Sequence, residues 1–402
     1  MFRWYRRFIC IAASAALVGV VAGCGGSDDR GASKDLSGEP VKISLVGDID
    51  APALGVTTPQ LRDAAVAAVE AVNRDGGING RPLELTVCNT QGDPNIAAKC
   101  ARTSINDGDA ASVGTYAIAG GATPVFTAAR FPTIGNFPLG PEDFDSPFSY
   151  PIVGGTPSAG TCSVALLADV VGVKKIGVLY SEAPASAAGN IVLERALSAR
   201  GLKATRFTAL PPNATDLTPY MTEVAQGSDA VVLVMAPVTA ARVVKTARGL
   251  GLDTDLVSVS LATKQLTELG RAAERLYQCS LLRPASAGGP GIDQMLREMK
   301  AANITPDVDD TATNAWLAVH LFAQVAATLD EITPATVAAA MDRLTDGDLS
   351  AIAPPLNTTE PFAGTADTWP RLFNPTVWYG QIADGKIALL RDNAVNPFQP
   401  AE

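Results

Sequence analysis

Residues 73–85, which read N-R-D-G-G-I-N-G-R-P-L-E-L, decide how this chain folds. The glycine pair at 76–77 predicts a helix end, because glycine readily adopts the left-handed backbone that stops a helix. Asn79 and Gly80 predict a tight turn, and the residues after Pro82 begin a strand.

The segments before this stretch complete a repeating unit. Residues 41–46, V-K-I-S-L-V, are an expected buried strand that ends at Gly47. Thr58 and Pro59 form an N-cap and first-turn pair for a helix. Apolar residues then follow at helical spacing at Leu61, Ala65, Ala68, Val69 and Val72. The order is strand, helix, glycine turn, strand.

Strand-like and helical runs alternate over most of the remaining chain. The expected strands are residues 41–46, 83–87, 111–114, 133–135, 174–180, 203–208, 230–235, 256–261 and 279–282. The expected helices are residues 95–107, 123–130, 162–171, 189–200, 218–226, 238–250, 263–275, 292–301, 311–329 and 334–344. A hairpin around Asp384 and Gly385 follows. This alternation predicts an α/β fold whose parallel sheets are covered by helices on both faces.

Four stretches carry a resemblance to a known family: AVNRDGGINGRPLEL, GDPNIAAKC, SVGTYAIAGGATPVFTAARFPTIG and KKIGVLYSE. They resemble the branched-chain amino acid (Leu/Ile/Val-binding) family of periplasmic-type solute-binding proteins of ABC transporters. The likeness covers nearly all of the chain after the tether described below and weakens toward the C-terminus. It implies two Rossmann-like lobes of the type I, Venus-flytrap kind, which close on a small molecule and hand it to ABC permease subunits.

Two breaks in the pattern fit a two-lobed chain. One lies at Gly154, Gly155 and Pro157, and the other is the stretch R-P-A-S-A-G-G-P-G at 283–291. The family's chain crosses between its lobes three times, which implies a third crossing near residues 353–362. We therefore expect an N-terminal lobe of residues 41–154 plus 286–355, and a C-terminal lobe of residues 155–285 plus 356–402.

The N-terminus reads as a lipoprotein signal peptide, residues 1–23. A basic segment with Arg3, Arg6 and Arg7 precedes the apolar residues 8–20, and V-A-G-C at 21–24 matches a lipobox. An ordinary secretory signal or a single membrane span is the alternative. In the lipoprotein reading Cys24 is lipidated, and residues 24–40 tether the domain to the bacterial cell membrane, on its extracellular or periplasmic face. The lipid is then the only membrane attachment, because residues 316–329 contain His320 and Gln324 and are expected to form a core helix.

The net negative charge of the chain argues against two classes of partner. The chain has 31 Lys and Arg, and without the three arginines of the signal 28 remain against 41 Asp and Glu, a net of −13. Such a charge disfavours nucleic acid and anionic lipid as partners. We expect a monomeric exported domain.

Cysteines outside the signal and the lipobox number four: Cys88, Cys100, Cys162 and Cys279. An even number in an exported chain suggests two disulfides. A zinc site is the alternative, disfavoured by the lack of closely spaced cysteine pairs and by the single histidine. The resemblance implies a bridge between Cys88 and Cys100, which leaves Cys162 and Cys279 for the second.

Ligand-binding candidates follow from the strand ends. Ligands of open parallel sheets bind beyond the carboxyl ends of the strands. The candidate residues are Asp48, Thr115, Tyr116, Gly120, Gly121, Thr123, Asn136 and Phe137 in the first lobe, and Glu182, Pro237 and Leu261 in the second. Tyr116 and Phe137 would stack on a ligand or pack against the hinge, and Glu182 would face a cationic group or solvent.

The stretch G-G-A-T-P at 120–124 is the most specific candidate. Thr123 and Pro124 read as an N-cap and first-turn pair, whose free N–H groups can bind a carboxylate or carbonyl. The alternative is a glycine turn that only permits close packing. Relatives hold the ligand's carboxylate at this helix start, so the resemblance implies a ligand contact here.

The sequence departs from the family pattern at positions where relatives bind their usual amino acid ligand. Relatives carry a hydroxyl residue where Gly120 stands, and a tyrosine before a glycine in the loop that here reads S-E-A-P-A-S-A-A-G. They also carry an acidic residue where this chain reads S-L-A-T-K at 260–264. We therefore expect a ligand other than a standard branched-chain amino acid, either less polar or with a carboxylate but no amine.

Enzyme signatures are missing from the sequence. His320 is expected to be a packed or surface residue, and G-T-P-S-A-G at 155–160 has the wrong spacing for a nucleophile elbow. The sequence has no G-x-x-x-x-G-K-[ST] and no H-E-x-x-H motif. The acidic clusters at 142–145 and 307–310 have no calcium-loop pattern and are expected on the surface. We expect no enzymatic activity, cofactor or metal. A ligand-sensing lipoprotein that uses the same cleft, and an exported hydrolase, are the alternatives.

Overall fold

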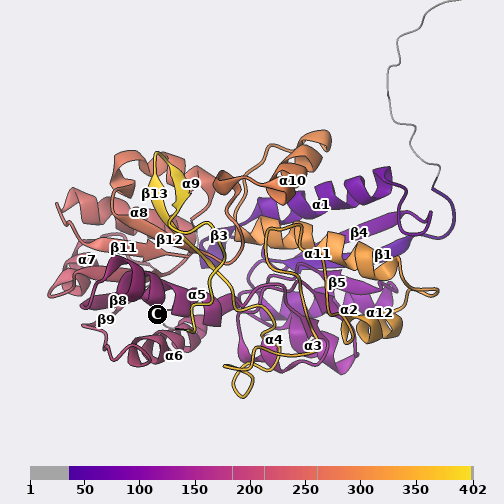
Figure 1. The fold of residues 1–402 in the computed structure, drawn as a ribbon, viewed down its shortest axis with the longest axis horizontal. Helices are drawn as coiled ribbons and strands as arrows, with labels where there is room; N and C mark the ends of the chain where they lie inside the picture. Colours follow the sequence, from indigo (N-terminus) through magenta and orange to yellow (C-terminus); the bar gives the residue numbers. More distant parts are fainter. Residues whose placement is uncertain (1–35, 183, 212, 260, 400–402) are drawn as a thin grey trace, which may run out of the picture. The chain divides into compact units, whose positions relative to one another are not determined.

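The computed structural model describes residues 36–399 apart from residues 183, 212 and 260 (Figure 1). The expected signal peptide, Cys24 and residues 24–35 of the tether lie outside the described residues. The predicted α/β class is confirmed, because two largely parallel sheets form and helices pack on both faces of each.

The first sheet has five parallel strands in the order β4-β1-β5-β6-β7. They are β1 (Val41–Gly47), β4 (Leu83–Asn89), β5 (Ala111–Val113), β6 (Thr133–Ile134) and β7 (Ser149–Tyr150). A small ribbon, β2 (Asp50–Ala51) and β3 (Val56–Thr57), follows β1. The helices of this part are α1 (Pro59–Arg74), α2 (Pro94–Asn106), α3 (Ala122–Ala128), α4 (Pro141–Asp145), α10 (Pro290–Ala301), α11 (Asp310–Ala326) and α12 (Pro334–Met341).

Apolar side chains of β1 alternate between the two helix layers. Ile43 and Leu45 are fully buried in the core with the apolar faces of α1 and α11, which lie side by side. Val46 points the other way, into a cluster with residues of α2 and α3 such as Phe126. Because neighbouring strand residues face opposite sides of a sheet, both faces of β1 are buried. Helix α11 includes the stretch 316–326, and its fully buried Trp316 confirms the predicted core helix.

The second sheet has seven strands in the order β14-β13-β12-β11-β10-β8-β9. The strands β8 (Ile176–Ser181), β9 (Phe207–Leu210), β10 (Ala230–Val234), β11 (Asp255–Ser258) and β12 (Leu276–Ser280) are parallel, and the predicted hairpin of β13 (Trp378–Ala383) and β14 (Lys386–Leu389) pairs antiparallel with β12. Its helices are α5 (Gly155–Ala165), α6 (Pro184–Ser198), α7 (Thr218–Ala225), α8 (Pro237–Gly249) and α9 (Thr263–Leu269). Leu166–Val171 continues α5 as a π-helical turn.

Residues 73–85 form the predicted turn and hold it with specific contacts. Helix α1 ends at Arg74, and the N–H of Gly77 donates to the carbonyl of Val72 at 2.9 Å. The Asn73 side chain donates to the Leu83 carbonyl at 2.9 Å and accepts the Leu83 N–H at 2.7 Å. This amide therefore aligns the start of β4 with the end of α1.

Several predicted bounds were wrong. Strand β9 begins at Phe207 instead of Lys203, and β12 begins at Leu276 and ends at Ser280. The N–H of Leu281, expected in that strand, instead donates to the Asp310 carboxylate at 2.7 Å. Helix α9 ends at Leu269, where Gly270 turns the chain with a φ of +51°. The short strand β7 was not predicted, because two residues carry no periodic pattern.

Both predicted disulfides are present. Cys88–Cys100 links β4 to α2 with Cα atoms 5.8 Å apart, and Cys162–Cys279 links α5 to β12 with Cα atoms 6.0 Å apart. Each bridge therefore fixes a helix to the sheet that it covers.

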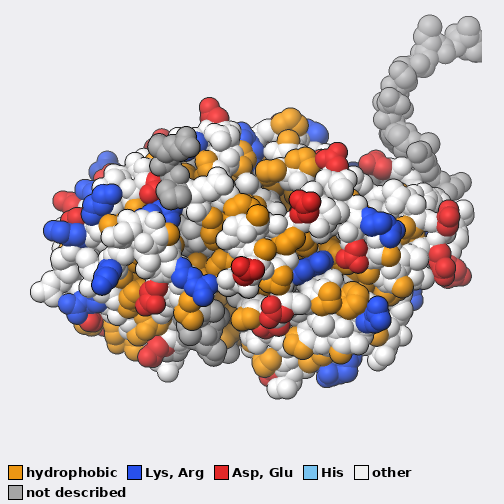
Figure 2. Space-filling model, turned by 60° about the horizontal axis from the view of Figure 1, so that its bottom comes forward, with side chains coloured by type: hydrophobic (Ala, Val, Ile, Leu, Met, Phe, Trp, Pro, Cys, Tyr) orange, Lys and Arg blue, Asp and Glu red, His pale blue; other side chains and the backbone are white. Residues whose placement is uncertain are grey.

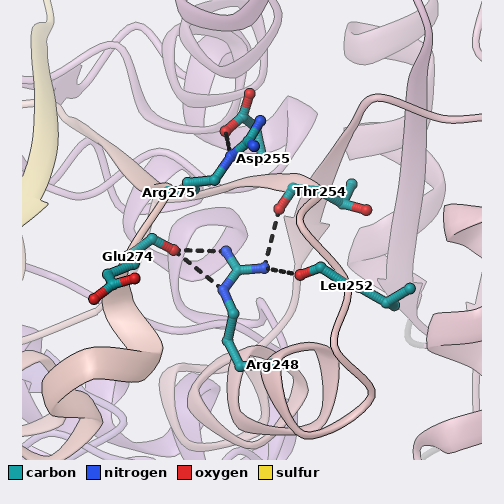
Figure 3. Close-up of polar contacts among 6 residues, drawn as sticks. All are labelled: Arg248, Leu252, Thr254, Asp255, Glu274 and Arg275. Atoms are coloured by element: carbon teal, nitrogen blue, oxygen red, sulfur yellow. Dashed lines mark hydrogen bonds and ion pairs between the residues drawn. The ribbon is translucent and has the colours of Figure 1, made fainter.

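Arg248 ties together the amino-terminal edge of the second sheet (Figure 3). From the end of α8 it donates to the carbonyls of Leu252 at 2.8 Å, Thr254 at 3.1 Å and Glu274 at 2.7 Å. Beside it, Arg275 pairs with Asp255 at 2.8 Å. These bonds fix the starts of β11 and β12, so this edge of the sheet serves as scaffold.

Charged side chains are mixed on the surface that Figure 2 draws. Lys and Arg alternate there with Asp and Glu, and apolar side chains lie between them. This face carries no continuous basic strip, in line with the acidic charge of the chain. Within the part of the chain that the structure covers, no helix combines the length and the apolar character needed to cross a membrane.

We predict that Gly77→Ala destabilises the fold strongly. Gly77 has a φ of +63°, and an added Cβ would lie 2.1 Å from the Arg81 carbonyl oxygen. We expect a loss of about 3 kcal/mol or more in the free energy of unfolding, measured by urea titration. The matched control is Gly80→Ala, where φ is +81° but nothing lies within 4 Å of the added Cβ. It should lose about 1 kcal/mol, from backbone strain alone. Equal losses would contradict the steric argument.

Candidate functional site

The predicted ligand-binding residues lie at the carboxyl edges of the two sheets. In the first sheet they follow β1, β5 and β6, which are neighbours. In the second, Glu182, Pro237 and Leu261 follow β8, β10 and β11, which are also neighbours. Across the described residues, no hydrogen bond, ion pair or ring contact joins a candidate of one sheet to a candidate of the other.

Asp48 is a buried latch at the end of β1, with only 1% of its surface exposed. One carboxylate oxygen accepts hydrogen bonds from the Thr90 hydroxyl and, at 2.9 Å, from the Gly92 N–H. The other accepts the Ile118 N–H at 2.7 Å. Asp48 therefore fastens two neighbouring loops to β1.

The Thr58 hydroxyl belongs to the same junction. It donates to the Asp48 carbonyl at 2.5 Å and makes no hydrogen bond to the first turn of α1. Thr58 does stand at the predicted N-cap position and Pro59 in the first turn, but the Thr58 side chain makes no capping hydrogen bond. The hydroxyl is used to anchor the loop after β1.

Thr115 and Asn136 are engaged within the first sheet. The Thr115 hydroxyl lies 2.9 Å from the Ser112 hydroxyl, and the Asn136 amide donates to Ser149 at 2.9 Å. Both side chains are at least 96% buried. The Asn136 bond links the ends of β6 and β7, and the Thr115 bond lies within the end of β5, so both side chains already have polar partners within the chain.

Tyr116 and Phe137 form an aromatic pair between the loops after β5 and β6. Their ring centroids lie 5.5 Å apart in an edge-to-face arrangement, and both residues are half-buried. The N–H of Phe137 donates to the Thr115 carbonyl at 2.8 Å, which joins the two loops. Burial first, and then the nearby Asp309 and Asp48, raise the pKa of the Tyr116 phenol, which stays protonated. The pair offers an apolar surface with one hydrogen-bonding hydroxyl.

Thr123 is not the N-cap of α3, so that prediction was wrong. The helix begins at Ala122 after Gly121, whose φ is +93°. A Cβ on Gly121 would lie 2.2 Å from the Pro94 carbonyl oxygen, so only glycine fits at this turn. The Thr123 hydroxyl instead donates to the Asp143 carboxylate at 2.6 Å.

Asp143 joins the loops on either side of it. Besides the Thr123 hydroxyl, its carboxylate accepts the N–H groups of Leu139 at 2.9 Å and Gly140 at 3.2 Å. Burial raises the pKa of Asp143, and these hydrogen bonds oppose that rise. The prediction that this acidic cluster coats the surface was therefore wrong for Asp143.

Glu142 is a site feature that sequence reasoning missed. A Cβ added to Gly120 would lie 3.0 Å from one Glu142 carboxylate oxygen, and one added to Gly140 would lie 2.7 Å from the other. The half-buried carboxylate thus lies against both glycines, at the carboxyl edge of the sheet. The sequence shows Gly120 and the stretch G-P-E at 140–142 as separate features. Only the fold brings Gly120 and Glu142 together.

The second-sheet candidates differ in what they present. Glu182 is exposed, and Pro237 opens α8. Leu261 is 1% exposed and packs with Leu266 in the core of this sheet, so its side chain does not face a cleft. Its carbonyl accepts a hydrogen bond from Gln278 at 2.9 Å.

Comparison with known proteins identifies the family. A family model described as periplasmic binding protein matches residues 40–364. A leucine-, isoleucine-, valine-, threonine- and alanine-binding protein of Pseudomonas aeruginosa is 34% identical over 77 residues, which cover 19% of this chain and 20% of that relative. The match thus spans about a fifth of the relative.

Solved structures share the fold. A substrate-binding periplasmic protein from Ralstonia solanacearum has a TM-score of 0.75 at 19% identity, covering 87% of this chain and 99% of that one. A branched-chain amino acid ABC transporter protein from Thermus thermophilus with bound valine has a TM-score of 0.75 at 16% identity, covering 90% and 98%. A fatty acid ABC transporter substrate-binding protein from Thermomonospora curvata has a TM-score of 0.72 at 18% identity, covering 90% and 94%.

We predict that Asp48→Ala destabilises the fold by about 3 kcal/mol or more, because it leaves one buried and two partly buried donors without their acceptor. Urea unfolding measures this loss. Glu182→Ala is the control: its exposed side chain should change stability by less than about 0.5 kcal/mol. A small effect at Asp48 would show that its carboxylate is not a structural latch.

Proposed function

The chain belongs to the periplasmic binding protein family, and from this premise we propose that it captures a small molecule between two lobes and delivers it to an ABC importer. The observation that supports this most is the presence of two largely parallel sheets with candidate loops at the carboxyl edge of each. Contacts from both lobes to one ligand favour a closed arrangement, because only such differential contacts shift a hinge equilibrium.

The sequence predicts lobes of residues 41–154 plus 286–355, and residues 155–285 plus 356–402. We propose the first two of these boundaries unchanged, but the contacts of residues 371–374 favour a later last crossing. Arg371 donates to the Ser149 carbonyl at 2.8 Å, and Asn374 donates to the Ile152 carbonyl at 3.0 Å. Both partners belong to the end of the first sheet, so we place the last crossing between Asn374 and β13.

The proposed ligand is not a standard branched-chain amino acid. The Thr123 hydroxyl is engaged by Asp143, and the Glu142 carboxylate lies against Gly120. A ligand carboxylate placed there would meet like charge, which is unfavourable at short range. On the second lobe, residues 261–264 carry no acidic side chain for an amino group.

An apolar or aromatic portion of the ligand would contact Tyr116 and Phe137. Among the first-lobe candidates, Asp48, Thr115 and Asn136 have their polar atoms bonded within the chain, whereas this pair is half-buried. Aromatic faces bury apolar surface effectively and accept stacked groups. The cleft is therefore proposed to select a less polar molecule.

Attachment to the membrane is proposed through Cys24 alone. Lipidation there and a tether up to residue 40 would hold the domain at the outer face of the bacterial cell membrane, where ABC permease subunits can accept the ligand. The protein is proposed to act as a monomer and without catalysis.

We predict that a single small molecule co-purifies with the protein. Denaturing extraction followed by mass spectrometry identifies it, and adding it to refolded protein should raise the melting temperature. Leucine, isoleucine and valine should leave the melting temperature unchanged at millimolar concentration. Tyr116→Ala or Phe137→Ala should weaken binding of the identified molecule by about 1 kcal/mol or more.

The matched control is Tyr220→Ala on α7, which lies in the other lobe and outside the candidate loops. It should bind with unchanged affinity. Strong stabilisation by leucine would overturn the proposed ligand class. Unchanged affinity in both aromatic variants would move the site away from the first lobe.

The anchor is tested by Cys24→Ala. We predict that the wild-type protein incorporates labelled palmitate in cells and that this variant does not, because the acyl chains have lost their attachment site. Autoradiography of the immunoprecipitated protein measures the label. A wild-type protein without label would indicate an ordinary secretory signal or a membrane span instead.

A further inference from the structure

Four aromatic rings form a row that runs from α4 to the C-terminal tail. The ring centroids of Phe144 and Trp369 lie 6.4 Å apart, and those of Trp369 and Phe398 lie 6.0 Å apart. The Phe362 ring centroid lies 5.8 Å from that of Phe398. These distances are typical of favourable ring pairs. We call Phe144, Phe362, Trp369 and Phe398 the aromatic bridge, which shares no residue with the predicted ligand site.

One end of the aromatic bridge is fixed to the first lobe. Phe144 belongs to α4, which follows β6 of the first sheet, and it is 2% exposed. The segment that carries Trp369 is held close by, because Arg371 and Asn374 donate to carbonyls at the end of the same sheet. This end of the bridge is therefore expected to move with the first lobe.

The other end is fixed to the second lobe. Val395 and Val377, which precedes β13, exchange two backbone hydrogen bonds of 2.9 and 2.8 Å. Arg200, just after α6, donates to the Pro397 carbonyl at 2.9 Å, and its side chain is only 4% exposed. Phe398 therefore reaches the aromatic bridge from a tail that the second lobe holds.

Trp369 has partners on both sides of the lobe boundary. The Phe144 ring comes from the first lobe, whereas the Phe398 ring and the Arg195 guanidinium of α6 come from the second. The guanidinium carbon lies 6.0 Å from the Trp369 ring centroid, within reach of a cation–π contact. Whichever lobe carries Trp369 along, at least one of these contacts joins it to the other lobe.

We propose that the aromatic bridge is a conformational lock that favours the arrangement of the lobes in which its rings meet. A rotation that moves the two anchored ends apart separates at least one ring pair and brings water to half-buried apolar rings. Contacts made in one arrangement only shift the equilibrium toward it. The lock rests on the two proposed lobes and requires no particular ligand.

The lock changes how the lobes respond to a ligand. A ligand that favours a different arrangement has to open the aromatic bridge, so its apparent affinity is reduced by the fraction of protein that is unlocked. A ligand that favours the same arrangement binds to lobes that already hold it. The tail after β14 thereby acts on the cleft without contacting the ligand.

The test measures the distance between the lobes by pulsed electron paramagnetic resonance. Spin labels are attached to cysteines introduced by Glu70→Cys on α1 and Lys245→Cys on α8, at two exposed positions. The full chain is purified and dialysed free of small molecules, and protein without the introduced cysteines gives the background label. We expect one narrow distance distribution with the intact bridge. Phe398→Ala should widen it by several ångströms or add a second population.

The matched control is Phe148→Ala, which removes another half-buried ring that lies beside an arginine. The Arg130 guanidinium is 5.8 Å from the Phe148 ring centroid, and both residues belong to the first lobe. This variant should keep the narrow distribution. If Phe398→Ala fails to fold, Phe362→Ala removes one ring pair and should widen the distribution to a smaller extent.

An unchanged distribution in the bridge variant, or the same widening in the Phe148→Ala control, would overturn the lock. The proposed capture of a small molecule fails on different grounds, namely that no molecule co-purifies with the protein or raises its melting temperature. Because the distances are measured without ligand, that failure would leave them unchanged, and failure of the lock would leave the search for the ligand unaffected.

Discussion

A single buried carboxylate, that of Asp48, holds the candidate site of the first lobe together. It joins the end of β1 to the loop before α2 and to the loop after β5. The loop after β5 in turn carries Tyr116, and its Thr115 carbonyl positions Phe137. Because parallel strands deliver separate loops to one edge, some interaction must fix those loops relative to one another. Here the Asp48 carboxylate does so by accepting three hydrogen bonds, and these bonds also determine where Tyr116 and Phe137 lie.

Sequence reasoning located most elements because their signals are local. Residues 41–46 and 230–235 are apolar runs of strand length, and β1 and β10 match them within a residue. The start of β9 was misplaced because its pairing with β8 fixes it, and that pairing begins where Phe207 lies opposite Val178. Pairing partners are distant in sequence, and no local pattern reports them.

The candidate site was predictable in position but not in chemistry. The loops after β1, β5 and β6 follow from the strand list, whereas the partners of their side chains do not. Asp48 meets Thr90 across 42 residues, and Thr123 meets Asp143 across 20. Such long-range bonds engage the side chains of Asp48, Thr123 and Asn136 within the chain, and their contact with a ligand stays a prediction. The same folding brought Glu142 against Gly120, which gives the family's usual carboxylate site an acidic neighbour.

The bridge between Cys162 and Cys279 has a mechanical consequence. Helix α5 follows the first proposed crossing between the lobes, and β12 precedes the second. The bridge therefore links the second-lobe ends of two of the three proposed connecting segments and fixes them relative to each other. It forms in an oxidising compartment, and its reduction would free these two segment ends from each other while leaving the strand pairing of both sheets in place.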